Sequence, residues 1–240
     1  MKKFLAFTLA ETLIVMGIIG VVAALTLPNL NSSTANKEKV VKLQKIYQNL
    51  NDAYGRAIAV YGPIDTWPQG NDSDTFVSRL MDFMKVAKYC ESGHAKDCIN
   101  IDTSLAAIIL PDGASLIVSA HFNCNSTTTL KTLGPVCGAF EIDLDGTNKG
   151  KNVFGVDMFS FLTTKDNGII PRHSRDSLDD ITKPYPNCCF AKPSDTSKWK
   201  HYSCTAWVIE NGNMDYLNAD ENGKCNNSNV TLSETVTSCK

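Results

Sequence analysis

The chain has 240 residues, 43% of them hydrophobic, and a formal net charge of −2 at pH 7. This length allows one domain beyond an N-terminal helix, with at most a small second lobe. The mildly acidic balance gives no basic footprint, which excludes general nucleic-acid binding.

The first element is an apolar run of 21 residues from Phe7 to Leu27. At about 1.5 Å per helical residue, such a run would span the hydrocarbon core of a bilayer. Lys2 and Lys3 precede it, which favours an orientation with the C-terminus outside. Its one formal charge is Glu11, a costly carboxylate at that depth unless something neutralises it. A secretory signal peptide or a plain signal anchor would leave this acid unexplained.

The start of the run resembles the N-terminal signature of type IV prepilins and type II secretion pseudopilins. The resemblance lies in the stretch Ala6-Phe7-Thr8-Leu9-Ala10-Glu11, followed by the apolar run and Pro28. It implies that a prepilin peptidase cuts between Ala6 and Phe7 and methylates the new N-terminus. Ala6 departs from the family, which usually has Gly before the cut. Pro28 falls where many pilins place a helix-kinking proline.

A charge pair explains why Glu11 would be kept under this resemblance. The mature Phe7 would carry an α-ammonium in apolar surroundings, and Glu11 of a neighbouring subunit would be a carboxylate in the same difficulty. Pairing them relieves two desolvation costs and sets the register of a polymer. The implied partners are the prepilin peptidase, other pilin or pseudopilin subunits and the inner membrane.

The rest of the chain divides by composition and periodicity. We expect a leader peptide at 1–6, a transmembrane and assembly helix at 7–28, an amphipathic helix at 29–61, a globular domain at 62–171 and a Cys-rich region at 172–240. The polar stretch 29–34 should soften or break the helix. Apolar residues then recur at spacings of three and four between Val40 and Tyr61, which predicts a helix face that packs on a sheet.

Beyond Gly62-Pro63, helical spacing predicts a second helix at 75–89. Strand-like runs occupy 106–110, 115–121 and 139–144, separated by turn residues, and one more strand is expected at 205–210. The predicted fold class is therefore α+β and pilin-like, with a long N-terminal helix packed on an antiparallel β-sheet and a disulfide-rich C-terminal region.

All nine cysteines lie from residue 90 onward, which predicts disulfides in an oxidising compartment. An odd number leaves at least one thiol free, modified or paired between chains. The short loops Cys90 to Cys98 and Cys124 to Cys137 are candidate bridges, and a zinc site using His94 or His121 is the weaker alternative. The remaining cysteines are Cys188, Cys189, Cys204, Cys225 and Cys239.

Oxygen ligands gather between residues 143 and 157, as a Ca²⁺ site requires. The candidate ligands are Asp143, Asp145, Asn148 and Asp157. The stretch lacks the full ligand pattern of an EF-hand, although it loosely resembles the calcium loop of major pseudopilins. The alternative interpretation is an Asp-Gly hairpin turn without a metal.

No nucleophile elbow, zinc-protease helix or phosphate-binding glycine loop is present in the sequence, so we expect no enzymatic activity. The sequence predicts a structural subunit of a type IV pilus or type II secretion pseudopilus. It would lie in the inner membrane as a single-pass protein and then in a periplasmic or cell-surface filament. The alternatives are a membrane-tethered extracellular binding module or adhesin and, less favoured, an exported enzyme.

Overall fold

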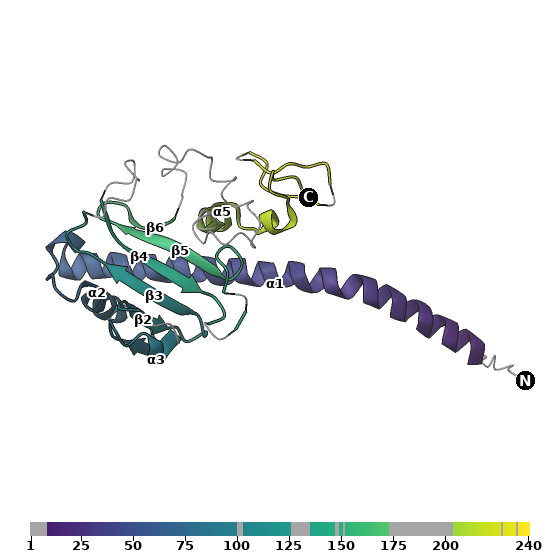
Figure 1. The fold of residues 1–240 in the computed structure, drawn as a ribbon, viewed down its shortest axis with the longest axis horizontal. Helices are drawn as coiled ribbons and strands as arrows, with labels where there is room; N and C mark the ends of the chain where they lie inside the picture. The colour runs from purple at the N-terminus through teal and green to yellow at the C-terminus, as the bar shows by residue number, and fades with distance from the viewer. Residues whose placement is uncertain are drawn as a thin grey trace, which may run out of the picture. The chain divides into compact units, whose positions relative to one another are not determined.

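The computed structural model describes residues 9–99, 103–125, 135–146, 149–150, 152–172, 204–226, 228–233 and 235–240. The chain divides into two compact units, Met1–Glu38 and Lys39–Lys240. Helix α1 (Leu9–Tyr61) begins in the first unit and ends in the second (Figure 1). It continues through the polar stretch 29–34, where we had expected the helix to soften or break. Asn and Ser each cost less than about 0.7 kcal/mol in a helix relative to Ala, so a few of them do not end one.

The predicted architecture combined a membrane-spanning half-helix at 7–28 with an amphipathic half packed on the sheet, and this fold class is wrong. A crossing needs about 20 consecutive apolar residues. Among the described residues, no helix is long and apolar enough to cross a membrane. The single-pass inner-membrane location is overturned by the same finding. The part of the fold class that the structure does contain is an α+β arrangement with an antiparallel sheet and disulfides.

In the second unit, α1 buries one face in the core. Val40, Leu43, Leu50 and Ala57 are all buried, at the spacings of three and seven that place side chains on one side of a helix. The helix ends where Gly62 takes a φ of +79°, with its N–H donating to the carbonyl of Ile58. Glycine is favoured there because a Cβ would strain a left-handed residue.

The sheet has six strands in sequence order, each antiparallel to the next. They are β1 (Lys88–Cys90), β2 (Ala106–Ile109), β3 (Ser115–Ala120), β4 (Val136–Asp143), β5 (Met158–Thr164) and β6 (Gly168–Pro171). Both edges are short, and β6 ends in a proline that cannot donate to another strand. Short edges and edge prolines limit pairing with other chains.

Two short helices and a 3₁₀ turn lie between α1 and β2 in the sequence: η1 (Ile64–Thr66), α2 (Asp72–Met81) and α3 (Lys96–Ile99). The predicted helix at 75–89 therefore starts earlier and ends earlier, and β1 occupies its expected last turn. Phe76 of α2 lies 5.5 Å from Phe140 of β4 between ring centroids. This contact joins α2 to the centre of the sheet.

The C-terminal region contributes α5 (Cys204–Asn211) and η4 (Asp215–Asn218). We had predicted a strand at 205–210, and the structure has a helix. Trp207 is fully buried and its indole N–H donates to Asn213 at 3.1 Å. The backbone N–H of Ser160 in β5 donates to the Thr205 hydroxyl at 2.9 Å. This region shares the main hydrophobic core, which the sequence did not lead us to expect.

Candidate functional site

The candidate site is the acidic loop, which we define as residues 143–157 between β4 and β5. Asp143 ends β4, and Asp157 precedes the first residue of β5. Gly146 and Gly150 have φ values of +88° and +68°, conformations that glycine adopts without strain. These turns fold the loop back on itself. They bring together the carboxylates of Asp143 and Asp157, which are 14 residues apart in sequence.

Backbone N–H groups hold two of the three carboxylates. Asp145 and Gly146 donate to Oδ1 of Asp143 at 3.3 and 3.2 Å. Asn152 and Val153 donate to Oδ2 and Oδ1 of Asp157 at 3.1 and 2.7 Å. These bonds fix the carboxylates of Asp143 and Asp157, which are both almost fully buried.

Two carboxylate oxygens in the loop remain without a hydrogen-bond partner among the described residues, namely Oδ2 of Asp143 and Oδ1 of Asp145. Both atoms are buried from solvent. A buried polar atom without a partner costs about 1–3 kcal/mol, and more if it is charged. Such atoms indicate a cation or a proton that would satisfy them.

Gly150 lies in a cradle formed by the acid groups. A Cβ placed on it would come within 2.3 Å of Oδ2 of Asp145 and 2.6 Å of Oδ2 of Asp157. No side chain fits there, so the space in front of Gly150 is bounded by carboxylate oxygens. We predicted these two aspartates as ligands from the sequence but missed Gly150. The signal that could have identified this glycine is its position next to an acid-rich turn.

The electrostatics of the loop are unfavourable to three charged carboxylates. Burial is the largest of the effects that together raise the pKa of Asp143 to about 7; the others that raise it are the side-chain interaction with Asp145 and the charges of Asp145 and Asp157. In its present arrangement, the described part of the chain has no group of three or more His, Cys, Asp or Glu side chains that could hold a metal ion. The predicted ligand Asn148 lies outside the described residues.

Every cysteine that the structure describes is disulfide-bonded. Cys90 is bonded to Cys98 and Cys124 to Cys137, which confirms both candidate bridges and rules out their cysteines as zinc thiolates. A third bond joins Cys225 to Cys239, and Cys204 is also disulfide-bonded. Cys188 and Cys189 lie outside the described residues. These bonds indicate an oxidising compartment.

The predicted processing residues Ala6 and Phe7 also lie outside the described residues. Glu11 and Pro28 fall within α1, but their side chains are not among those that the structure describes. Among the described side chains of α1 between Leu9 and Val21, the large apolar ones are between 51% and 81% exposed. They form a second candidate surface, which we call the apolar start of α1.

Comparison of the chain with protein-family models, with curated proteins and with solved structures gave no match.

Proposed function

We propose that this chain is a structural subunit of a pilin-like or pseudopilin-like filament. A prepilin peptidase would remove residues 1–6, and the mature chain would assemble through the N-terminal part of α1. The supports for the proposal are the sequence around Ala6, Phe7 and Glu11 and the apolar start of α1.

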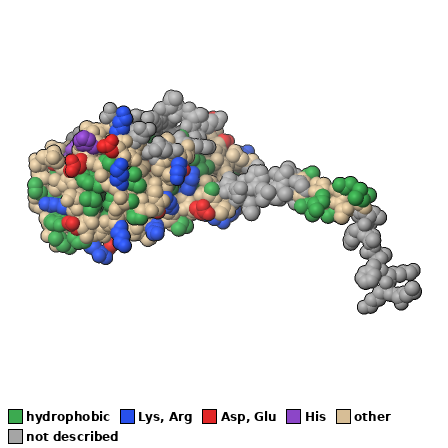
Figure 2. Space-filling model, turned by 90° about the horizontal axis from the view of Figure 1, so that it is seen from below, with side chains coloured by type: hydrophobic (Ala, Val, Ile, Leu, Met, Phe, Trp, Pro, Cys, Tyr) green, Lys and Arg blue, Asp and Glu red, His purple; other side chains and the backbone are tan. Residues whose placement is uncertain are grey.

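The observation that carries the proposal is the exposure of that apolar start. Leu13, Ile14, Met16, Ile18 and Ile19 are each more than half exposed, and hydrophobic side chains gather there in the space-filling view (Figure 2). Residues so close in sequence point to all sides of a helix. A helix that is hydrophobic all round is stable only when it is surrounded by apolar partners. In a filament, the equivalent helices of other subunits are those partners.

The part of α1 that lies in the second unit differs from this start, because its apolar side chains are buried. Leu43 and Leu50 are fully buried by the chain's own sheet and helices, so that part of α1 needs no other subunit. Removing apolar surface from water contributes about 25 cal/mol per Å². Association is therefore favoured at the start of α1, where nothing in the described chain covers the side chains.

The mature N-terminus tests the proposal. When the chain is produced together with a prepilin peptidase, we expect mass spectrometry to find Phe7 as the first residue, carrying one methyl group. An Ala6→Gly variant, which restores the residue usual in the family, should be cut at least as fast. Production without the peptidase is the control and should leave residues 1–6 in place. A mature chain that still begins at Met1, or that begins after Ala23, would contradict the proposal.

We also propose that the acidic loop binds Ca²⁺. Asp143, Asp145 and Asp157 would hold the ion after their carboxylates turn toward it, because in the present arrangement they do not form a metal-holding group. The two partnerless oxygens and the cradle at Gly150 support this assignment. Calcium accepts carboxylate oxygens in flexible geometry and would neutralise charges that the loop otherwise keeps close together. The ion would have a structural role, since it would tie the end of β4 to the start of β5.

Thermal unfolding measures this binding. At a Ca²⁺ concentration about 100 times the Kd, binding contributes about 2.7 kcal/mol, which corresponds to a rise in Tm of about 5–10 °C for a chain of this size. Asp143→Asn should lose most of that rise. Asp220→Asn is the matched control, because Asp220 also accepts two backbone hydrogen bonds in a turn but lies outside the acidic loop.

The pH dependence of the calcium effect has a definite sign. Because the pKa of Asp143 is raised to about 7, the metal-free folded chain holds a proton there that the unfolded chain releases near pH 4. Its contribution to stability therefore falls as the pH rises through that window. Calcium needs the deprotonated carboxylate, so its stabilising effect should be larger at pH 8 than at pH 5. An equal rise in Tm for Asp143→Asn and the unmodified chain would contradict the site.

A further inference from the structure

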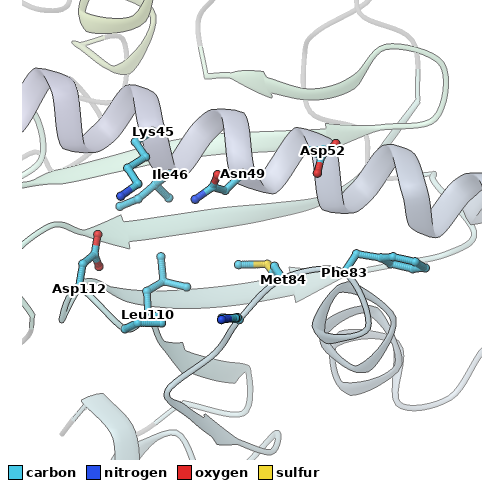
Figure 3. A pocket seen from close by; sticks show the side chains of 10 residues that line it. Lys45, Ile46, Asn49, Asp52, Phe83, Met84, Leu110 and Asp112 are labelled. Carbon is cyan, nitrogen blue, oxygen red and sulfur yellow. The ribbon is translucent and has the colours of Figure 1, made fainter.

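A groove runs along one flank of α1 in the second unit, between that helix, the segment after α2 and the turn between β2 and β3 (Figure 3). Its charged lining residues are two lysines and two aspartates, namely Lys45, Lys85, Asp52 and Asp112. The apolar lining residues Ile46 and Leu110 are buried. The described lining of the groove therefore has no net charge that would select a partner.

The acidic loop, in contrast, is held from outside at two consecutive carbonyl groups. The hydroxyl of Tyr216 in η4 donates to the carbonyl oxygen of Gly155 at 2.7 Å. Nζ of Lys39 in α1 donates to the carbonyl oxygen of Val156 at 3.0 Å. These two carbonyls directly precede Asp157, a candidate calcium ligand. The groups that hold them therefore also determine where that ligand lies.

Tyr216 is in turn fastened to the disulfide-bonded part of the C-terminal region. Oδ2 of Asp215, its neighbour in η4, accepts from the hydroxyl of Ser238 at 2.7 Å and from the backbone N–H of Cys239 at 2.8 Å. Cys239 is bonded to Cys225. A continuous set of contacts thus joins the acidic loop, through the Tyr216 hydroxyl and η4, to this disulfide.

The charge on the loop acts on the segment that Tyr216 holds. The carboxylate of Asp157 accepts from the backbone N–H groups of Asn152 and Val153, so it moves together with the segment that contains Gly155. Without a cation, repulsion among the three carboxylates favours an open loop, in which this segment moves away from η4. A bound cation removes that repulsion and favours the closed loop, in which the Gly155 carbonyl keeps its hydrogen bond to Tyr216.

We propose that Tyr216 is a positioning residue of the calcium site, which holds the acidic loop closed so that Ca²⁺ binding and the packing of η4 strengthen each other. This inference rests on the proposed binding of Ca²⁺ and adds a residue that does not touch the ion. By linkage, the factor by which the packing of η4 raises the affinity for Ca²⁺ is also the factor by which bound Ca²⁺ favours that packing. Such coupling factors are typically about 5–150.

Titration calorimetry of the full chain with CaCl₂ at pH 8 measures one direction of the coupling. Tyr216→Phe removes the hydroxyl and keeps the ring that packs edge-on against Trp207. We expect this variant to fold and its Kd for Ca²⁺ to rise by about fivefold or more. If Tyr216 only stabilised the fold, the Tm without metal would fall and the Kd would not change, and that result would overturn the inference.

Tyr54→Phe is the matched control for this titration. Tyr54 is also buried, and its hydroxyl also donates to a backbone carbonyl, that of Thr164. Thr164 ends β5, whereas the acidic loop precedes the first residue of that strand. The Kd of this variant for Ca²⁺ should therefore equal that of the unmodified chain. An equal rise in Kd for both tyrosine variants would also overturn the inference.

Hydrogen exchange measures the opposite direction of the coupling. In the unmodified chain, the backbone amides of residues 213–226 should exchange about fivefold or more slowly in CaCl₂ than in EGTA. In Tyr216→Phe this difference should largely disappear, because the link between the loop and η4 is cut. Asp143→Asn is the control that lacks a ligand, and its exchange should be the same with and without Ca²⁺.

The outcomes separate this inference from the proposed function. If the unmodified chain binds Ca²⁺ and Tyr216→Phe changes neither the Kd nor the exchange, the positioning role is wrong and the calcium site stands. If the unmodified chain does not bind Ca²⁺, both are wrong, while the filament proposal is decided by the mature N-terminus.

Discussion

Phe161→Ala is expected to lower the free energy of unfolding by about 3–5 kcal/mol, a large share of the 5–15 kcal/mol typical of a folded domain. The Phe161 side chain is fully buried on β5, and its ring stacks on Tyr47 of α1 with centroids 5.1 Å apart. In the sheet it lies directly opposite Phe140 of β4. Removing the ring therefore leaves a cavity where the helix meets the sheet, and urea unfolding followed by circular dichroism would measure the loss.

The control for this variant is Val41→Ala on α1. Val41 is 64% exposed, so shortening it should change the free energy of unfolding by less than about 0.5 kcal/mol. A comparable loss in both variants would mean that the contact between Tyr47 and Phe161 is not a major support of the fold.

The strands that were predicted correctly from the sequence are those with a clear turn on at least one side. The runs at 106–110 and 115–121 flank Pro111-Asp112-Gly113, and the structure has β2 and β3 there, with Gly113 at a φ of +86°. The run at 139–144 precedes Asp145-Gly146, and β4 begins three residues earlier than predicted. Turn chemistry is local, and for this reason these elements could be found without an alignment.

Strands β5 and β6 were both missed, and for β5 the reason is physical. Residues 159–164 of β5 are all buried, so the strand shows no alternation of apolar and polar side chains. Because Ser160, Thr163 and Thr164 are polar although they are buried, the run is less hydrophobic than a fully buried strand is expected to be. The helix α5 was misassigned for a related reason, because a short apolar run at 205–210 fits a strand and a buried helix equally well.

The candidate site was predicted in part. The aspartates at 143, 145 and 157 were identified because oxygen ligands cluster near a turn. The cradle at Gly150 depends on a positive φ and on contacts with two side chains, which composition does not encode. The groove beside Lys45 was not predicted at all, because it joins residues from α1, the segment after α2 and the turn between β2 and β3.

Glu11→Ala is expected to abolish filament assembly while it leaves the globular domain folded. In the proposed filament, Glu11 of one subunit pairs with the α-ammonium of Phe7 in its neighbour, in surroundings made apolar by the packed starts of α1. Removing one member of a buried charge pair costs about 3–5 kcal/mol, because the other charge is left without compensation. Electron microscopy of the mature chain would count filaments, and thermal unfolding would show an unchanged Tm for the domain.

Thr12→Ala is the matched control for Glu11→Ala. Thr12 is the next residue of α1, and its exposed hydroxyl donates to the carbonyl of Leu9 at 3.0 Å within the same helix. Losing that hydrogen bond removes no charge, so assembly should persist. Because Glu11→Gln keeps the size of the side chain and removes only its charge, this variant should fail as Glu11→Ala does. Normal filaments from the Gln variant would show that the size and polarity of the side chain are sufficient at this position, and the charge pair would have to be abandoned.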